Sequence, residues 1–531
     1  MAGFLSVSLC AAPSVPAPDI EWQQSFGGNG NDSLQSLREA SDGGYVLSGW
    51  SESPPSGNKT SPYFGSVASD LWVVRLDANG QILWDKTFGG DKQEGGRCAI
   101  RQTSDGGFIL GSMSRSGISG NKTSPQLGNP DYFDLWVIRL DPEGDKLWEA
   151  SLGGVRNEIF GSIEETSDGG FILGGSSDSG AGGNKSGPNY GSWDYWLVRL
   201  DRNGCKLWDS TFGGARDDYL YALQQTADGG FILGGESWSS VSGNKTSSNY
   251  GGADFWVIRV DPNGNKLWEK SYGGSNWDNL RGLAQTIDGG FAFGGYSYSY
   301  PGVSGNKTSV NSSIVDFWVV RTDAQGEILW EKTYGGGGYS FLGSLRTTID
   351  GGFILGGSYL DSPAEGRVGN KTSPSFGLCD YWIVRTDGLG NLLWDQSFGG
   401  TRDDVLFDLQ QTDDGGFLVG GESLSSTNGN KARLNYGERD YWVVKLAAED
   451  LDADGVPDLR DLCSHTPPGE VVNGQGCSLG QLAPCDGPWK NHGEYVQAVT
   501  EVSKDFLRSG LISREERRAI ILQASKSECG E

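Results

Sequence analysis

Short stretches of alternating apolar and polar residues follow one another along most of the chain, separated by turn residues. Residues 217–226 (DDYLYALQQT) lead to an Asp-Gly-Gly turn that begins at Asp228, and residues 231–237 (FILGGES) follow it. After a long loop, residues 254–261 (DFWVIRVD) lead to a Pro-Asn-Gly turn and then to residues 265–272 (NKLWEKSY). Alternation bounded by Gly, Asn and Asp is typical of β-strands. The pattern therefore predicts a repeating unit of four strands.

Three signals mark this unit seven times, at intervals close to 60 residues. The Asp-Gly-Gly turn begins at Asp42, Asp105, Asp168, Asp228, Asp288, Asp350 and Asp414. A tryptophan two residues after an aspartate recurs at Trp72, Trp136, Trp196, Trp256, Trp318, Trp382 and Trp442. A tryptophan shortly before a Gly-Gly pair recurs at Trp22, Trp84, Trp148, Trp208, Trp268, Trp330 and Trp394. Seven repeats of four short strands predict an all-β, seven-bladed β-propeller over residues 19–448.

The phase of the repeat bears on how the ring closes. The chain enters at a fourth strand (EWQQSF, 21–26) and leaves the array after a third strand (DYWVVKL, 440–446). We expect the N-terminal strand to complete the last blade, which removes two exposed strand edges. A linear solenoid is the alternative, but neither end of the array carries the polar capping repeat that a solenoid needs.

Most repeated residues fit a structural role. The recurring aromatic residues are expected in the core between blades. An aspartate at the start of each third strand is expected to accept hydrogen bonds from turn amides, and it recurs at Asp70, Asp134, Asp194, Asp254, Asp316, Asp380 and Asp440. Each long loop carries Gly-Asn-Lys, with the asparagine at Asn58, Asn121, Asn184, Asn244, Asn306, Asn370 and Asn430. This motif predicts an asparagine turn whose lysine forms a local salt bridge, or else a functional loop.

An acidic residue follows most Gly-Gly pairs by four positions, where the chain passes from one blade to the next. The acids are Asp32, Glu94, Glu158, Asp218, Asp278 and Asp404, whereas the sixth repeat has Ser340. In a propeller they form a partial ring near the axis, with the seven lysines further out. Two interpretations remain open: pairing of each carboxylate with a neighbouring Lys or Arg, and a cation or ligand site over the channel.

The composition changes at about residue 449, where DLDADGVPDLRD begins. Counted from its first aspartate, side-chain oxygen donors stand at positions 1, 3, 5, 9 and 12. Gly455 at position 6 allows a sharp turn, and the residue at position 7 can offer its main-chain carbonyl. The predicted ligands are Asp450, Asp452, Asp454, Val456, Asp458 and Asp461. That spacing predicts an EF-hand-like Ca²⁺ loop, and an aspartate at position 12 has a shorter reach than the usual glutamate.

Residues 449–482 resemble a bacterial thrombospondin type 3 repeat. The resemblance implies Ca²⁺ binding by the aspartate-rich loop and a disulfide at the adjacent cysteine. The four cysteines of the tail, Cys463, Cys477, Cys485 and Cys529, allow three connectivities. We favour Cys463 with Cys477 and Cys485 with Cys529. The second bridge would clasp a helical hairpin over 483–531, with helices over 493–509 and 513–526.

The formal net charge of −26 argues against nucleic acid or an anionic membrane as a partner. No run of 18 apolar residues predicts a transmembrane helix. Residues 1–18 read as a secretory signal, and cysteines clustered in a small tail fit an oxidising compartment. We therefore expect an extracellular, secreted monomer.

Enzyme chemistry is constrained because the chain has only two histidines, His465 and His492, both in the tail. A Ser-His-Asp triad and a histidine zinc site are therefore excluded from the propeller. The repeats resemble a broad group of bacterial extracellular propellers that share no single activity. The interpretation is an extracellular Ca²⁺-binding recognition or scaffold protein whose propeller face binds a glycan or a protein. The alternative is a polysaccharide-active hydrolase or lyase, since carboxylate pairs are abundant.

Overall fold

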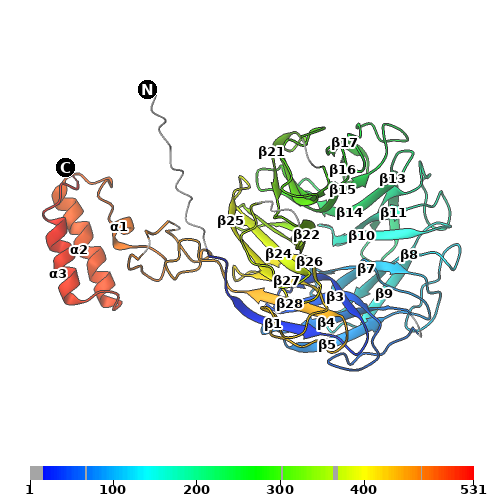
Figure 1. Ribbon diagram of the computed structural model, residues 1–531, viewed down its shortest axis with the longest axis horizontal. Coiled ribbons are helices and arrows are strands. Elements are labelled where there is room, and N and C mark those ends of the chain that lie inside the picture. Colours follow the sequence, from blue (N-terminus) through cyan, green and yellow to red (C-terminus); the bar gives the residue numbers. More distant parts are fainter. Residues whose placement is uncertain are drawn as a thin grey trace. The chain divides into compact units, whose positions relative to one another are not determined.

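A computed structural model describes most of the chain and divides it into two compact units (Figure 1). The described residues are 16–65, 68–299, 303–362, 369–463, 465–467 and 469–530. The propeller comprises Ile20–Gln411 and Leu418–Lys445. The second unit comprises Met1–Asp19, Thr412–Phe417 and Leu446–Glu531. The prediction of a secretory signal falls almost entirely on residues 1–15, which lie outside the described part.

Seven antiparallel four-stranded sheets make up the propeller. The first blade has β2 (Asp32–Glu39), β3 (Tyr45–Ser51), β4 (Asp70–Leu76) and β5 (Ile82–Phe88). The second has β6 (Ala99–Gln102), β7 (Phe108–Ser114), β8 (Asp134–Leu140) and β9 (Lys146–Leu152). The third has β10 (Glu158–Glu165), β11 (Phe171–Ser177), β12 (Asp194–Leu200) and β13 (Lys206–Phe212). The fourth has β14 (Asp218–Gln225), β15 (Phe231–Ser237), β16 (Asp254–Val260) and β17 (Lys266–Tyr272).

The last three blades follow the same order. The fifth has β18 (Asp278–Gln285), β19 (Phe291–Ser297), β20 (Asp316–Thr322) and β21 (Ile328–Tyr334). The sixth has β22 (Tyr339–Thr347), β23 (Phe353–Leu360), β24 (Cys379–Thr386) and β25 (Leu392–Phe398). The seventh has β26 (Asp404–Gln411), β27 (Phe417–Ser423), β28 (Asp440–Leu446) and, as its outer strand, β1 (Ile20–Phe26).

The ring closes as the sequence predicts. The sheet order β1-β28-β27-β26 places the N-terminal strand beside the last strand of the array. The first strands of successive blades contact one another around the axis, and β26 contacts β2 across the closure (Figure 1). The seven-bladed propeller is therefore confirmed, and the strands β2, β6, β10, β14, β18, β22 and β26 line its centre.

Aromatic packing between blades forms the core. The third-strand tryptophans are almost fully buried in all seven blades. The Trp256 ring lies 4.8 Å from the ring of Tyr195 in the preceding blade, and the Tyr195 hydroxyl donates to the Trp256 carbonyl at 3.0 Å. Large buried rings remove much apolar area from water and pack at specific angles. The repeat therefore stabilises the ring at every blade junction.

In the first six blades an arginine from the third strand fixes the Asp-Gly-Gly turn, and Lys445 stands at the equivalent position in the seventh. At the first turn Asp42 accepts a hydrogen bond from the Gly44 amide at 3.0 Å and pairs with Arg75 at 2.5 Å. Gly43 has φ +79°, a conformation that favours glycine. Arg75 also donates to the Tyr45 carbonyl at 3.0 Å, so it ties the turn to the strand that follows.

The tail contains three helices and two disulfides. The helices are α1 (Leu479–Leu482), α2 (His492–Arg508) and α3 (Arg514–Ala524). Ser513 and Glu516 form the capping box of α3. The bridges join Cys463 to Cys477 and Cys485 to Cys529, with Cα atoms 5.0 and 4.7 Å apart, which confirms the favoured pairing. No helix in the described part of the chain is both long and apolar enough to cross a bilayer.

Candidate functional site

The Gly-Asn-Lys loops join adjacent blades. The Asn244 side-chain oxygen accepts from the Gly213 amide at 2.9 Å, and its amide group donates to the Thr211 carbonyl at 2.8 Å. Both partners belong to the end of the preceding blade, and the same pair of bonds occurs at all seven junctions. These side chains therefore satisfy backbone groups that would otherwise be unpaired where the strands end.

The lysine of the motif is buried and not displayed on a surface. Lys245 is 1% exposed, and its ammonium lies 4.9 Å from the centre of the Trp256 ring. It donates to the hydroxyls of Ser247 and Ser271 at 2.8 and 2.7 Å. Burial lowers the pKa of Lys245 to about 8. Within the described residues the partners of Lys245 are hydroxyls and an aromatic ring and not a carboxylate, so the predicted local salt bridge is wrong; the asparagine turn is present, and the motif has a structural function.

The six acids of the predicted ring are also buried. Each is 0% exposed, because it lies inside the wall beneath the loops and caps the turn that precedes it. Asp278, for example, accepts from the Gly274 amide at 2.7 Å. Within the described residues, no Lys or Arg forms an ion pair with Asp32, Glu94, Glu158, Asp218, Asp278 or Asp404. The expected ring on an open face is therefore absent.

Each buried acid is instead near the third-strand aspartate of the preceding blade. The pairs are Asp440 with Asp32, Asp70 with Glu94, Asp134 with Glu158, Asp194 with Asp218, Asp254 with Asp278 and Asp380 with Asp404. Burial, and then the neighbouring charge, raises the pKa of Asp254 to about 7. A Cβ atom on Gly273 would come within 2.1 Å of Asp254 Oδ1, so only glycine fits between the strands here. Like charges this close favour a shared proton.

The sixth junction departs from this pattern in two positions at once. Ser340 replaces the acid, and Tyr359 replaces the serine that ends the second strand in the other blades. The Tyr359 hydroxyl accepts from the Gly338 amide at 2.8 Å. The phenol therefore accepts an amide of this turn, two residues after the glycine amide that the acids accept at the other junctions.

The central cavity contains the residues that break the repeat. It has a volume of about 530 Å³, and the innermost strands line it. At the end of the strands nearer the Asp-Gly-Gly turns, Asp408 pairs with Arg38 at 2.6 Å and with Arg346 at 3.1 Å. These arginines, together with Arg101, hold the pKa of Asp408 at about 2 despite its burial. Burial, reinforced by the neighbouring arginines, lowers the pKa of Arg101 to about 9.

A second group of charged side chains lines the cavity closer to the first residues of the inner strands. It is about three residues, or roughly 10 Å along the strand, from the group around Asp408. The guanidinium carbons of Arg97 and Arg281 lie 4.0 and 4.3 Å from the centre of the Tyr221 ring. The Tyr221 hydroxyl donates to Glu236 at 3.1 Å, and Arg281 donates to the Tyr296 hydroxyl at 2.9 Å. Arg281 Nη1 is buried without a hydrogen-bond partner among the described residues.

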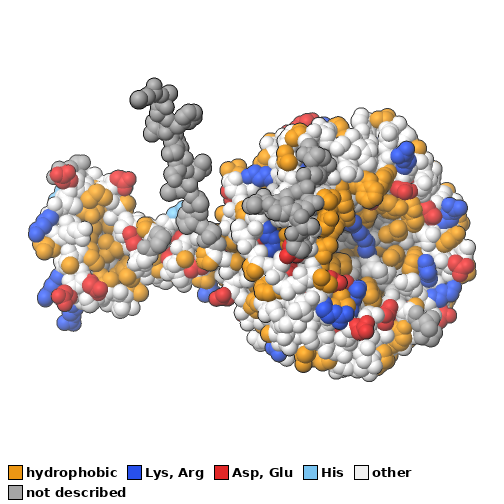
Figure 2. All heavy atoms as spheres, in the orientation of Figure 1, with side chains coloured by type: hydrophobic (Ala, Val, Ile, Leu, Met, Phe, Trp, Pro, Cys, Tyr) orange, Lys and Arg blue, Asp and Glu red, His pale blue; other side chains and the backbone are white. Residues whose placement is uncertain are grey.

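Aromatic side chains from the third to the sixth blade continue from this group. Trp277 lies 5.3 Å from Trp238 and 5.7 Å from Tyr298, measured between ring centres. Tyr296 lies 6.1 Å from Tyr298 and 5.3 Å from Phe341. We call Trp193, Tyr219, Trp238, Trp277, Tyr296, Tyr298 and Phe341 the aromatic rim. Figure 2 shows orange and blue side chains gathered around the centre of the propeller.

Sequence reasoning missed this site, although a signal for it exists. The position seven residues before each Asp-Gly-Gly turn faces the cavity and differs from blade to blade. Its occupants are Gln35, Cys98, Gly161, Tyr221, Arg281, Gly343 and Phe407. Arg97 also faces the cavity, but it does not stand seven residues before its Asp-Gly-Gly turn. Gly95 and Gly96, with φ +98° and +89°, interrupt the strand before β6.

Comparison with known proteins identifies relatives at low identity. The chain is 25% identical to the regulatory protein FlaEY of Caulobacter vibrioides over 363 residues, which is 60% of this chain and 36% of that protein. The chain thus matches little more than a third of that relative's length. No protein family matches the sequence.

Solved structures resemble the chain at lower identity still. A protein of unknown function from Dyadobacter fermentans (12% identical, TM-score 0.39) and the Neurospora crassa Pan2 WD40 domain (9%, TM-score 0.39) each cover 82% of this chain and align over their full length. YCF48 bound to D1 peptide covers the same shares at 8% identity, with a TM-score of 0.41.

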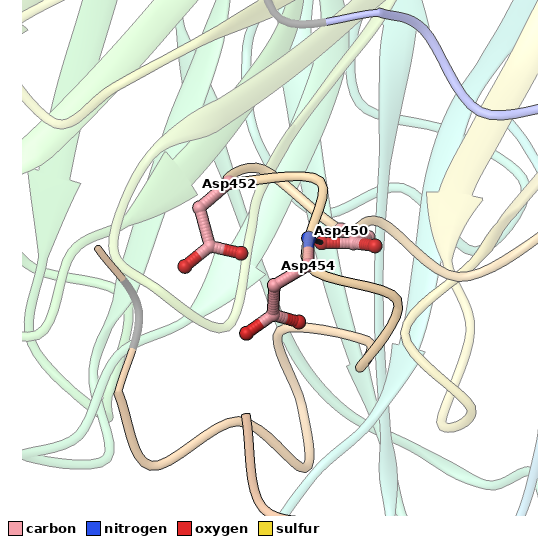
Figure 3. Close-up of side chains that lie close together, drawn as sticks. All are labelled: Asp450, Asp452 and Asp454. Atoms are coloured by element: carbon pink, nitrogen blue, oxygen red, sulfur yellow. Dashed lines mark hydrogen bonds between the residues drawn. The ribbon is translucent and has the colours of Figure 1, made fainter. Parts of the chain in front are cut away.

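The acidic loop of the tail is the second candidate site. One carboxylate oxygen from each of Asp450, Asp452 and Asp454 lies within 4.8 Å of the others, the one such group that the described residues contain (Figure 3). Asp450 accepts from the amides of Asp454 and Gly455 at 3.2 and 2.8 Å, which folds the loop tightly.

The loop leaves several buried oxygen atoms without partners. These atoms are Asp452 Oδ1, Asp454 Oδ2 and Asp461 Oδ2. Orphaned carboxylate oxygens that converge are the donors a Ca²⁺ ion requires, so the residues present fit this ion. Burial and the nearby aspartates raise the pKa of Asp461, although that carboxylate also accepts the Cys463 amide at 2.6 Å.

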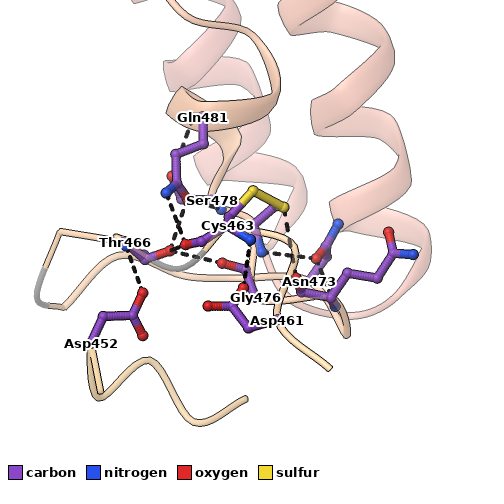
Figure 4. The surroundings of a disulfide bond; sticks show 10 residues. Asp452, Asp461, Cys463, Thr466, Asn473, Gly476, Ser478 and Gln481 are labelled. Atoms are coloured by element: carbon purple, nitrogen blue, oxygen red, sulfur yellow. Dashed lines mark hydrogen bonds between the residues drawn. A yellow bond between two sulfur atoms is a disulfide. The ribbon is translucent and has the colours of Figure 1, made fainter. Parts of the chain in front are cut away.

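The disulfide region holds the loop from one side. Asp452 accepts from the Thr466 amide at 2.7 Å, and the Thr466 hydroxyl donates to the Gly476 carbonyl at 2.7 Å (Figure 4). Asp458, a predicted ligand, accepts from the Leu451 amide at 2.8 Å. The Val456 amide donates to Asp454 at 2.8 Å. The six predicted residues thus belong to one hydrogen-bonded turn, with three of the carboxylates closest together.

Proposed function

We propose that this protein is an extracellular recognition protein. In this proposal the propeller face around the central cavity binds a glycan or protein partner, and the acidic loop of the tail binds Ca²⁺. Propellers present rigid, concave surfaces on which loops and inner strands can vary without cost to the wall. The two disulfides of the tail support an oxidising, extracellular setting. The expected state is a monomer.

The observation that carries the binding proposal is the set of inner-strand residues that break the repeat. Arg281 occurs in one blade only, and it has a buried guanidinium nitrogen without a hydrogen-bond partner among the described residues. The paired acids of the wall also leave carboxylate oxygens without partners, but those acids recur at the blade junctions and lie against one another. A buried polar group without a partner is costly and calls for an explanation. A bound ligand group provides that explanation.

For the tail, Asp450, Asp452, Asp454 and Asp461 would hold the ion with carboxylate oxygens. Bound Ca²⁺ would neutralise charges that repel one another and order the turn. We expect this effect on the tail to be structural.

Calorimetric titration of the full chain with Ca²⁺ tests this part of the proposal. We expect binding that Asp452→Asn weakens by at least about tenfold, because it removes one charged ligand. Asp505→Asn, on the exposed face of α2, changes the same charge in the same tail and should leave binding unchanged. Undiminished Ca²⁺ affinity of Asp452→Asn would contradict the assigned site.

Partner binding is tested by screening the full chain against a glycan array and an extracellular protein fraction. Specific capture of either class supports recognition. The alternative, a polysaccharide-active hydrolase or lyase, is tested on the same sugars by following the release of reducing or unsaturated ends. In the cavity Asp408 is held ionised by its arginines, so it is unsuited to act as a general acid.

A further inference from the structure

The central cavity is positively charged in a strongly acidic protein. Five arginines line it, Arg38, Arg97, Arg101, Arg281 and Arg346, against two acids, Glu164 and Asp408. The surplus of three positive charges contrasts with the formal net charge of −26 for the chain. Glu236, bonded to Tyr221 behind the cavity wall, offsets one of them. A surplus of buried cations attracts an anionic group.

The chemistry of these cations favours an oxyanion with two acceptor oxygens side by side. Guanidinium groups match carboxylates and sulfates with paired, parallel N–H donors. Arg281 is held against Tyr221 and Tyr296, with its Nη1 atom buried and unpartnered among the described residues. It is therefore oriented in advance, which lowers the cost of binding. Burial and the proximity of Arg281 also lower the pKa of Arg97 to about 10, a repulsion that an anion would relieve.

The surroundings of Arg281 favour a ligand with apolar faces. Trp277 is 46% exposed and, with its ring neighbours Trp238 and Tyr298, forms part of the aromatic rim. Arg97 lines both the central cavity and a smaller apolar cavity of about 390 Å³, whose other walls include Phe133 and Trp193. Tilted aromatic rings beside charged donors suit a ligand that is polar at its edges and apolar on its faces.

We infer that the central cavity binds an acidic oligosaccharide, with a carboxylate or sulfate of the sugar at Arg97 and Arg281 and the sugar rings on the aromatic rim. This inference rests on the proposed recognition function and names the class of its ligand. A cavity of about 530 Å³ is within the size range of small-ligand sites. A folded protein partner needs a far larger contact area and would not enter it.

The test uses the full chain on an array of uronate-containing, sulfated and neutral oligosaccharides, followed by calorimetry. The probes for calorimetry are the strongest acidic sugar on the array and the same sugar with its acid esterified or desulfated. We expect the acidic form to bind at least about tenfold more tightly, with an affinity that falls as salt increases. An acidic peptide, hexaglutamate, serves as the competing ligand class.

Arg281→Gln is the decisive variant, because glutamine already occupies the equivalent cavity position as Gln35 in the first blade. We expect it to weaken binding of the acidic sugar by about ten- to hundredfold without changing the thermal midpoint. Arg202→Gln removes the same charge from an exposed turn and should bind like the wild type. Circular dichroism and the midpoint show whether each variant is folded.

Several outcomes overturn the inference. They are an array without acidic ligands, equal affinity for the neutralised sugar, an Arg281→Gln variant with unchanged affinity, and binding of hexaglutamate but of no sugar. If a neutral glycan or a protein binds and Arg281→Gln does not change its affinity, the recognition function is supported and the proposed ligand class is wrong. If no glycan on the array binds and no extracellular protein is captured, both the recognition function and the ligand class are contradicted.

Discussion

The wall of the propeller and its central cavity are built by the same repeats, yet they follow opposite rules. In the wall, tryptophan, asparagine, lysine and paired acids recur from blade to blade, and each contacts the adjoining repeat. In the cavity, one position carries glycine, arginine or tyrosine in different blades. Wall residues must match the next blade, whereas cavity residues face open space and are free to differ. In this fold repetition indicates architecture, and departures from it mark the positions at which we propose recognition.

Replacing a wall tryptophan tests this contrast most severely. Trp256 is 0% exposed and packs on Tyr195 and Lys245, so Trp256→Ala leaves a cavity at a blade junction. We expect a loss of about 3–5 kcal/mol in unfolding free energy, measured by denaturant titration. Trp277→Ala, at a half-exposed rim position, should cost less than about 1 kcal/mol. Equal losses would mean that rim and wall do not differ.

The second-largest loss of stability is expected at the asparagine that joins two blades. Asn244→Ala removes bonds to the Gly213 amide and the Thr211 carbonyl, and it leaves both groups unpaired at the junction. We expect a loss of about 1–3 kcal/mol in the same titration. Asn263→Ala, in an exposed turn, provides the matched control and should be close to neutral. A neutral Asn244→Ala would show that water replaces the bonds without cost.

The paired acids predict how stability depends on pH. Burial and the paired charge raise the pKa of Asp254 to about 7 and that of Glu158 to about 8, so the native state keeps protons that the unfolded chain has lost. Their stabilising contribution is complete below the unfolded value near 4 and is lost as pH rises through about 7 to 8. Lys245 also faces the Asp254 pair and opposes the shift only in part.

Thermal unfolding between pH 4 and pH 8 measures this loss. We expect the midpoint to fall as pH rises across that range. Asp278→Asn should flatten the profile, because it removes the like charge that Asp254 meets. Asp168, whose pKa is lowered to about 2, acts in the opposite sense and contributes stability that is lost only in strong acid. A midpoint that rises steadily up to pH 8 would contradict shared protons at the junctions.

The repeat made most of the fold predictable from sequence. Blade number, ring closure by residues 21–26 and the helical hairpin follow from spacing, strand phase and capping residues. The four tail cysteines left three pairings open, and the structure contains the favoured one. The burial of Lys245 and Asp278 did not follow, because a charged residue in a loop is usually solvated. Only the packing of two blades reveals that the loop folds over the junction and closes these side chains in.

The cavity was harder to predict for a different reason. Arg281 and Arg346 occupy positions that are unremarkable in a single repeat, and their side chains reach Tyr221 and Asp408 only when neighbouring blades pack together. A search for departures from the repeat would have found Arg281, since the seven equivalent positions can be aligned by their distance from the Asp-Gly-Gly turn. It would have missed Arg97, which two glycines displace from that register.

The smallest expected effect on stability is at the cavity itself. Arg346→Gln should change the unfolding free energy by less than about 1 kcal/mol, because glutamine fills the equivalent position as Gln224 and Asp408 keeps Arg38 at 2.6 Å. Arg385 lies in the wall of the same blade, where its side chain is 1% exposed and pairs with Asp350 at 2.8 Å. Arg385→Gln breaks this pair, and we expect it to lower the unfolding free energy several times more than Arg346→Gln does. Both variants are measured in one denaturant titration. A larger loss for Arg346→Gln than for Arg385→Gln would mean that the charges of the cavity are structural, because they would then hold the ring together as the wall residues do.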